Sequence, residues 1–170
     1  MSRLNDKVVL VTGGASGLGK SGATLMHAEG AKVIITDIND DLGKATAQEI
    51  GGDALFVHHD VSKLAEWDRV IDLVIDRYGR LDVLVNNAGI TKDNLLVRMQ
   101  ENEIDDVIDI NLGSLIKISK IILKNMMKNR YGRIISISSV VGFTGNPGQA
   151  NYCASKAGII GFTKSLAIEV

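Results

Sequence analysis

Five short runs of apolar residues, rich in Val and Ile, recur along this chain; four are unbroken, and Ser136 interrupts the last. They occupy residues 8–11, 33–35, 55–57, 83–85 and 134–137. Each run is too short to form a helix by itself, and none of them alternates between apolar and polar residues. Unbroken runs of this kind are typical of strands that are buried on both faces of a parallel sheet.

Longer segments with helical spacing separate these runs. Residues 17–29, 40–50, 63–78 and 101–128 place apolar side chains three and four apart, and a last helix is expected from about Asn151. Asp40 is a candidate N-cap for the second of these helices. Alternating strands and helices favour right-handed crossovers. We therefore predict an α/β fold, a Rossmann-type doubly wound parallel sheet of five strands in the order 3-2-1-4-5.

Composition narrows the class of protein. The 170 residues carry a net charge of −1 and include one Pro and no linker-like or repeated tract, so a single domain over residues 1–170 is expected. The charge balance gives no sign of nucleic-acid binding. No signal pattern opens the chain, no apolar run approaches the ~20 residues of a membrane span, and Cys153 has no second cysteine to pair with. A soluble, cytoplasmic protein is expected.

A glycine-rich turn follows the first predicted strand and opens the first predicted helix. Glycines permit a sharp turn and the close approach of a pyrophosphate, and the helix N-terminus supplies free N–H donors. This context favours a dinucleotide-binding loop over a bare turn. Its candidate contacts are Thr12, Gly13, Ser16, Gly17, Leu18 and Gly19.

The second strand ends at Asp37, where a carboxylate can accept hydrogen bonds from the ribose hydroxyls of a dinucleotide and would repel a 2′-phosphate. No Lys or Arg lies in residues 14–17 or directly after Asp37. NAD(H) is therefore favoured, and NADP(H) stays open. Asp37 as a solvated strand-end residue is the alternative. Asp60 and Val61, after the third strand, are weaker candidates for contact with the adenine.

Candidate catalytic residues cluster in the second half of the chain. Tyr152 and Lys156 are four apart, so a helix places them on one face, where an ammonium favours the phenolate of its neighbour. Ser139 follows the fifth strand and is a candidate donor to a substrate oxygen. Asn111 interrupts an apolar helical stretch. Asn87, Ala88 and Gly89 follow the fourth strand, beside the predicted cofactor.

Together these motifs resemble the short-chain dehydrogenase/reductase family over nearly the whole chain. TGGASGLG at residues 12–19 is similar to the glycine motif of the family, and NNAG at residues 86–89 matches a second motif. Asn111, Ser139, Tyr152 and Lys156 coincide with the catalytic tetrad. The resemblance implies hydride transfer at a nicotinamide. Tyr152 would exchange the proton, Lys156 would hold the ribose and favour the phenolate, Ser139 would bind the substrate oxygen and Asn111 a relay water.

The two halves resemble different branches of that family. NAGITKDNLLVRM at residues 87–99 and the stretch from residue 126 to 156 are similar to 3-oxoacyl-[acyl-carrier-protein] reductases. That resemblance implies a carrier-protein-bound 3-oxoacyl substrate, with Arg130 at a docking position. The first half, with ITDIND at residues 35–40, is more similar to NAD-preferring hydroxysteroid or hydroxyacyl dehydrogenases.

The family pattern continues beyond residue 170 with two more strands and a substrate-binding loop. An exposed fifth strand and exposed apolar faces are therefore expected in this chain. The resemblance also implies a homo-oligomer, formed through the helices after Asn94 and after Asn151. Two functions stay open: an active reductase, and a dinucleotide-binding or subunit-interaction fragment without turnover.

Overall fold

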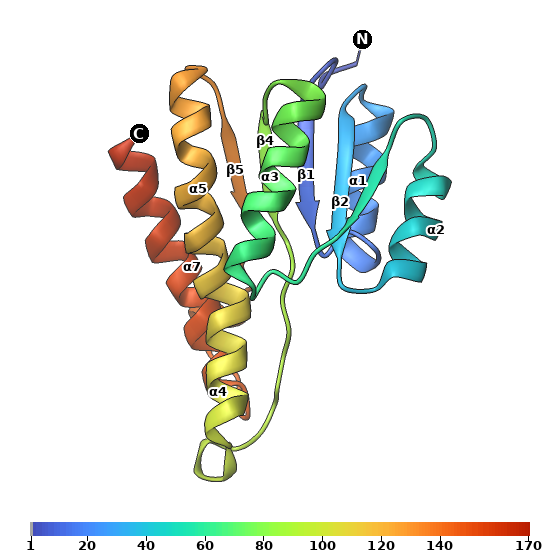
Figure 1. Ribbon diagram of the computed structural model, residues 1–170. Coiled ribbons are helices and arrows are strands. Elements are labelled where there is room, and N and C mark those ends of the chain that lie inside the picture. The colour runs from blue at the N-terminus through green and yellow to red at the C-terminus, as the bar shows by residue number, and fades with distance from the viewer. Residues whose placement is uncertain (1) are drawn as a thin grey trace.

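The computed structural model describes residues 2–170 and contains one five-stranded, all-parallel sheet (Figure 1). The strands are β1 (Val8–Thr12), β2 (Lys32–Asp37), β3 (Leu55–His58), β4 (Val83–Asn86) and β5 (Arg133–Ser136). Their order is β3-β2-β1-β4-β5. The predicted fold and strand order are confirmed. The order reverses between β1 and β4, and an open α/β sheet binds ligands at such a point, beyond the carboxyl ends of its strands.

Two hydrophobic clusters, one on each face of the sheet, explain why the strand sequences are continuously apolar. Val9, Val11 and Ile35 face the helices α1 (Gly17–Ala28) and α2 (Asp40–Ile50). Leu10 and Ile34 face α3 (Leu64–Tyr78) and α5 (Ser114–Lys128). Because successive side chains of a strand point to opposite faces, most positions of a strand that is covered on both faces are buried and apolar.

The strand β5 is the more exposed of the two edge strands. Like β3, it pairs with a neighbour on one side only, but Ile135 of β5 is 41% exposed whereas Leu55 and Phe56 of β3 are half-buried. The prediction that every apolar run is buried on both faces is therefore wrong for β5, since no helix or strand among residues 2–170 covers its outer side fully. The exposed edge itself agrees with the expectation for this strand.

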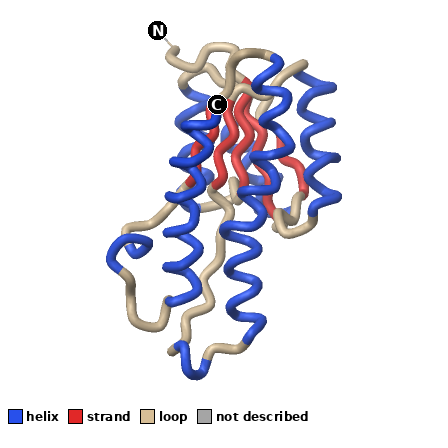
Figure 2. The backbone as a smooth tube through the Cα atoms, turned by 90° about the vertical axis from the view of Figure 1, so that its left-hand side faces the viewer, coloured by secondary structure: helices blue, strands red, loops and turns tan. Residues whose placement is uncertain are grey.

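The segment 101–128 forms one long rod, but it is not uniformly α-helical. It consists of α4 (Glu101–Ile108), a π-helical turn η2 (Asp109–Gly113) and α5. The short helices η1 (Leu96–Arg98) and α6 (Val141–Thr144) precede and follow this region, and α7 (Ala150–Glu169) closes the chain. Figure 2 shows that α4 and the start of α7 extend past the carboxyl ends of the strands. These extensions surround the region where the candidate site residues lie.

Two further details complete the fold. The side chain of Asn39, and not that of Asp40, caps α2 by accepting a hydrogen bond from the Leu42 N–H at 3.0 Å. The predicted Asp40 cap is wrong because the helix begins one residue after the cap, at Asp40 itself. Among the described helices, none is both long and apolar enough to cross a membrane.

His59 lies at the end of β3 and is almost completely buried, with its ring edge against Trp67 at a centroid distance of 3.9 Å. Burial lowers the pKa of His59 to about 4. Because the unfolded chain takes up this proton near the ordinary value of 6.5, the contribution of neutral His59 to stability is complete above pH 6.5. It is lost as the pH falls toward 4.

The stability of the wild-type chain should therefore fall relative to a His59→Gln variant, by at most about 3 kcal/mol between pH 6.5 and pH 4. Urea unfolding at three pH values measures this difference. His58→Gln, at an exposed neighbouring position, is the control. A constant gap between the wild type and His59→Gln across this range would contradict the expectation.

Candidate functional site

A tightly folded glycine loop joins β1 to α1 at the carboxyl edge of the sheet. Gly13 has φ of 61° and Gly17 has φ of 53°, a region that favours glycine. A Cβ at Gly19 would lie 2.2 Å from the Gly13 carbonyl oxygen and 2.6 Å from the Asn87 Nδ2 atom. The loop can therefore close on itself only with glycine at position 19.

The open side of this loop has the chemistry that an anionic group requires. The N–H groups of Gly17, Leu18 and Gly19 meet no acceptor among residues 2–170, and the Ser16 side chain makes no capping bond. A Cβ at Gly17 would meet nothing within 4 Å. A helix N-terminus with free donors beside open space fits the pyrophosphate of a dinucleotide. The residues predicted as the phosphate loop lie together here.

The motif after β4 holds this loop in place. The Asn87 side chain donates hydrogen bonds to the carbonyl oxygens of Thr12 and Gly13, each at 3.0 Å. The Thr12 hydroxyl accepts from the N–H groups of Asn87 and Ala88, each at 3.1 Å. Asn87 therefore shapes the loop through its amide, which is engaged with the chain itself.

Asp37 lies beside the glycine loop, as the sequence predicts. Its Oδ2 atom accepts a hydrogen bond from the Ala15 N–H at 3.2 Å, and its Oδ1 atom accepts one from the Asn39 N–H at 3.1 Å. Each oxygen keeps a free lone pair, because a carboxylate oxygen can accept more than one bond. The next residue, Ile38, is exposed.

Asp60 and Val61 lie near Asp37, because the preceding residue, His59, donates a backbone hydrogen bond to the Asp37 carbonyl. Their polar groups, however, are used locally. The Asp60 carboxylate accepts two hydrogen bonds from Ser62, and the Val61 carbonyl accepts one from Trp67. Burial acts to raise the pKa of Asp60, but the Ser62 bonds and Lys63 outweigh it and hold this pKa below its usual value. The Asp60 carboxylate thus accepts hydrogen bonds within the turn that follows β3.

Asn111 lies in the π-helical turn and is 2% exposed. Its Oδ1 atom accepts from the Ile90 N–H at 2.8 Å, and its Nδ2 atom donates to the Ile90 carbonyl at 2.9 Å. A Cβ at Gly89 would lie 3.1 Å from this Oδ1 and 3.7 Å from the Lys156 Nζ atom. The absence of a side chain at Gly89 therefore allows β4, η2 and α7 to converge. Such π turns are frequent at functional sites.

Lys156 is 4% exposed, although it carries an ammonium group. Its Nζ atom donates to the Ile137 carbonyl at 2.8 Å and lies 5.5 Å from the centre of the Tyr152 ring. No ion pair within residues 2–170 involves Lys156. Burial consequently lowers the pKa of Lys156. A buried, unpaired ammonium beside a phenol is typical of functional sites.

Ser139 occupies the turn between β5 and α6, next to α7. The Ser138 hydroxyl donates to the Lys156 carbonyl at 2.8 Å, and a Cβ at Gly142 would lie 3.0 Å from the Lys156 carbonyl carbon. The Ser139 hydroxyl itself accepts only a long bond of 3.4 Å from the Val141 N–H. It remains free to act as a donor.

The sequence interpretation missed two buried polar residues of α7. Asn151 is 4% exposed and Ser155 is 0% exposed, and both make hydrogen bonds to other elements. Their spacing of four residues, one position ahead of Tyr152 and Lys156, is the only signal in the sequence that could have indicated them. No group of potential metal ligands occurs among the described residues.

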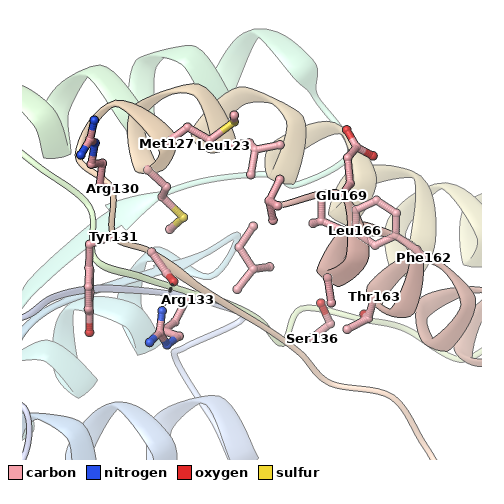
Figure 3. Close-up of a pocket in the computed structure, with 15 residues that line it drawn as sticks. Leu123, Met127, Arg130, Tyr131, Arg133, Ser136, Phe162, Thr163, Leu166 and Glu169 are labelled. Carbon is pink, nitrogen blue, oxygen red and sulfur yellow. Dashed lines mark hydrogen bonds between the residues drawn. The ribbon is translucent and has the colours of Figure 1, made fainter.

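A cavity of about 710 Å³ lies away from these residues. Figure 3 shows that it lies between α5 and α7, over the edge strand β5. Leu123 and Met127 line one side, Phe162 and Leu166 line the other, and Ser136 lies at the floor. We call this space the β5 groove. Since it contains none of the predicted catalytic residues, its size indicates an uncovered apolar face and not the reaction site.

This groove has an expected consequence for the purified 170-residue chain. Exposed apolar surface of this kind favours association, so the chain should bind the dye ANS and self-associate at micromolar concentration. Light scattering and dye fluorescence measure both effects. A monodisperse monomer with a cooperative, high melting transition and no dye binding would contradict this expectation.

Comparison with known proteins agrees with the geometry. The profile of the family described as short chain dehydrogenase matches residues 7–170. A 3-oxoacyl-[acyl-carrier-protein] reductase of Vibrio cholerae is 48% identical over 98% of this chain and 68% of its own length. Those of Escherichia coli and Thermotoga maritima are each 47% identical, over 96% and 99% of this chain and 67% and 70% of their own lengths. The chain belongs to the short-chain dehydrogenase family.

Proposed function

We propose that this chain is an oxidoreductase that reduces a 3-oxoacyl thioester with a reduced nicotinamide dinucleotide. The observation that carries the proposal is the buried, unpaired ammonium of Lys156 beside Tyr152 on α7. The names of the relatives, all 3-oxoacyl-[acyl-carrier-protein] reductases, support this substrate class. When bound, the nicotinamide would supply the hydride.

In the proposed mechanism the Tyr152 hydroxyl donates a proton to the carbonyl oxygen of the substrate. The Ser139 hydroxyl donates a hydrogen bond to the same oxygen and stabilises the charge that develops there. The nearby ammonium of Lys156 favours the phenolate that is left after proton donation. The reverse reaction would use the same groups with Tyr152 as the base.

Lys156 and Asn111 take supporting roles in this proposal. One N–H of Lys156 binds the Ile137 carbonyl, and two more remain to hold the ribose hydroxyls of the cofactor. Both N–H groups of the Asn111 side chain are engaged, with Ile90 and Ser155. A relay water at Asn111 would therefore use the remaining lone pair of its Oδ1 atom.

We propose NAD(H) as the preferred cofactor, with Thr12, Gly13, Ser16, Gly17, Leu18 and Gly19 at the pyrophosphate and Asp37 at the adenosine ribose. Asn87, Ala88 and Gly89 would lie between the loop and the nicotinamide. The Asp37 carboxylate and the absence of Lys and Arg at residues 14–17, 38 and 39 support this choice. Asp60 and Val61 remain secondary candidates near the adenine.

Replacement of Asp37 by Ala should weaken NADH binding by about 1–3 kcal/mol, since two hydroxyls lose a charged acceptor. Binding of NADPH should weaken less, or improve, because the repulsion of its 2′-phosphate is removed. Fluorescence titration with both cofactors measures these affinities. Unchanged affinity for NADH would exclude the ribose role of Asp37.

Two kinds of partner are part of the proposal. Arg130 follows α5 at an exposed position, where it can contact an acidic carrier protein that holds the substrate. A homo-oligomer would form through α4, α5 and α7. The acidic first turn of α4 and the exposed lysines of α5, together with exposed Leu96 and Val97, support self-association there.

A second candidate is dinucleotide binding or subunit interaction without turnover, which the uncovered β5 groove favours. Oxidation of a hydroxysteroid or hydroxyacyl group is the alternative reaction. Absorbance at 340 nm with NADH and an acetoacetyl thioester separates these functions. Turnover supports the reductase, whereas saturable NADH binding without turnover supports the second candidate for the 170-residue chain.

A further inference from the structure

The helix α7 carries two adjacent stripes of residues with the same spacing. Tyr152 and Lys156 form one stripe, and Asn151 and Ser155 form the other, one position earlier. Residues four apart on a helix lie above one another on one face. Asn151 and Ser155 are both buried, yet neither is apolar. A buried polar side chain must be matched by hydrogen bonds, so the partners of this second stripe are informative.

Asn151 connects α7 with two other segments. Its Nδ2 atom donates to the Lys92 carbonyl at 3.0 Å and to the Glu103 carbonyl at 2.8 Å. Its Oδ1 atom accepts from the Tyr152 N–H at 2.7 Å. One amide thus joins the loop after β4, the first turn of α4 and the backbone of Tyr152.

Ser155 makes a second connection one turn further along the helix. Its hydroxyl donates to the Tyr152 carbonyl at 2.7 Å and accepts from Asn111 Nδ2 at 3.2 Å. Asn111 in turn is bonded to both backbone groups of Ile90. Tyr152 is therefore held from both sides, through its N–H by Asn151 and through its carbonyl by Ser155.

We propose that Asn151 and Ser155 are positioning residues, which hold α7 against η2 and the loop after β4 so that Tyr152 and Lys156 face the reacting groups. The roles of Tyr152 and Lys156 come from the proposed function, on which this inference rests. The polar groups of both side chains are bonded within the chain, so this role requires no contact with the substrate. Apolar residues at 151 and 155 could fill the same space. Without directional hydrogen bonds, however, they would not fix the position of α7 along its own axis relative to η2 and the loop after β4.

A shift of α7 would affect both the reaction rate and the surroundings of Lys156. A displacement of reacting groups by about 1 Å can cost about 100-fold in rate. The same displacement would open the space around Lys156, whose burial lowers its pKa. The pKa of Lys156 therefore reports how closely α7 packs against η2 and the loop after β4, and its measurement requires neither substrate nor turnover.

The test uses Asn151→Ala and Ser155→Ala in the 170-residue chain. Ser155→Ala removes only a hydroxyl and should fold even if Asn151→Ala does not. We expect kcat for the thioester to fall about 10- to 100-fold with KM and NADH affinity within about twofold. The pKa of Lys156, followed by NMR of its Cε and Nζ signals and assigned with Lys156→Met, should rise toward its ordinary value of 10.5.

Ser165→Ala, on the exposed side of α7, and Asn129→Ala, after α5, are the matched controls and should leave both readouts unchanged. A lower melting temperature of Ser155→Ala with an unchanged Lys156 titration overturns the inference, because the hydroxyl would then be merely structural. If the wild-type chain turns over no thioester, the reductase proposal fails. A raised Lys156 pKa in the variants would still support the positioning role.

Discussion

Replacement of Tyr152 by Phe is expected to lower kcat for thioester reduction by about 100- to 10,000-fold, the usual contribution of a general acid. NADH affinity should stay within about twofold. The change removes only the hydroxyl, and the ring can keep its place 5.5 Å from the Lys156 Nζ atom. Initial rates at 340 nm and a fluorescence titration with NADH separate the chemical step from binding.

Tyr131→Phe is the matched control. The Tyr131 ring lies under Lys7 and Arg133 at the opposite end of the sheet, and the loss of its hydroxyl should change neither rate nor affinity. Retained turnover in Tyr152→Phe would show that another group donates the proton. A loss of NADH binding in that variant would instead indicate that Tyr152 acts by shaping the cofactor site.

The fold could be predicted because its signal is repeated along the chain. Strands such as β1 and β2 are covered by helices on both faces, so they are continuously apolar and stand out against the helical spacing of α2 and α3. Strand β5 also carries apolar residues, Ile134 and Ile135, but it is partly exposed. Its sequence is suited to a covered strand, and no pattern within the run itself reveals whether a cover is present.

Local departures from regular structure could not be predicted in this way. At the π turn η2, Asn111 bonds to Ile90, which is 21 residues earlier in the chain. Asn39 and Asp40 are both good caps by residue type, and only the backbone decides between them. A contact between distant segments is thus present at the π turn, whereas at α2 the local path of the backbone selects Asn39 over Asp40.

In the candidate site, too, some residues could be predicted from the sequence and others could not. Thr12, Gly13 and Asn87 could be predicted from motifs, and the hydrogen bonds among them show how the motifs fit together. Asp60 is a candidate by its position after β3, and only the structure shows that its carboxylate also accepts two hydrogen bonds from Ser62. Asn151 was not predicted, because its partners come from two segments that only the folded chain brings to α7.

The second large effect is expected at Gly19. A Cβ there would lie 2.2 Å from the Gly13 carbonyl oxygen, and this oxygen cannot move away because Asn87 binds it. Gly19→Ala should therefore lower the free energy of unfolding by about 3 kcal/mol, at the upper end of the usual cost of overpacking. It should also abolish measurable NADH binding, since the open N–H groups of the loop lose their arrangement. Urea unfolding and a fluorescence titration measure the two effects.

Gly22→Ala, one turn further along α1, is the control that separates this clash from a general effect of alanine. A Cβ at Gly22 would meet nothing within 4 Å, and alanine in a helix interior is favoured over glycine by about 1 kcal/mol. Gly22→Ala should therefore be slightly more stable than the wild type and bind NADH normally. If Gly19→Ala bound NADH as well as Gly22→Ala does, the glycine loop would not be the pyrophosphate site. The dinucleotide would then have to be placed elsewhere along the carboxyl edge of the sheet.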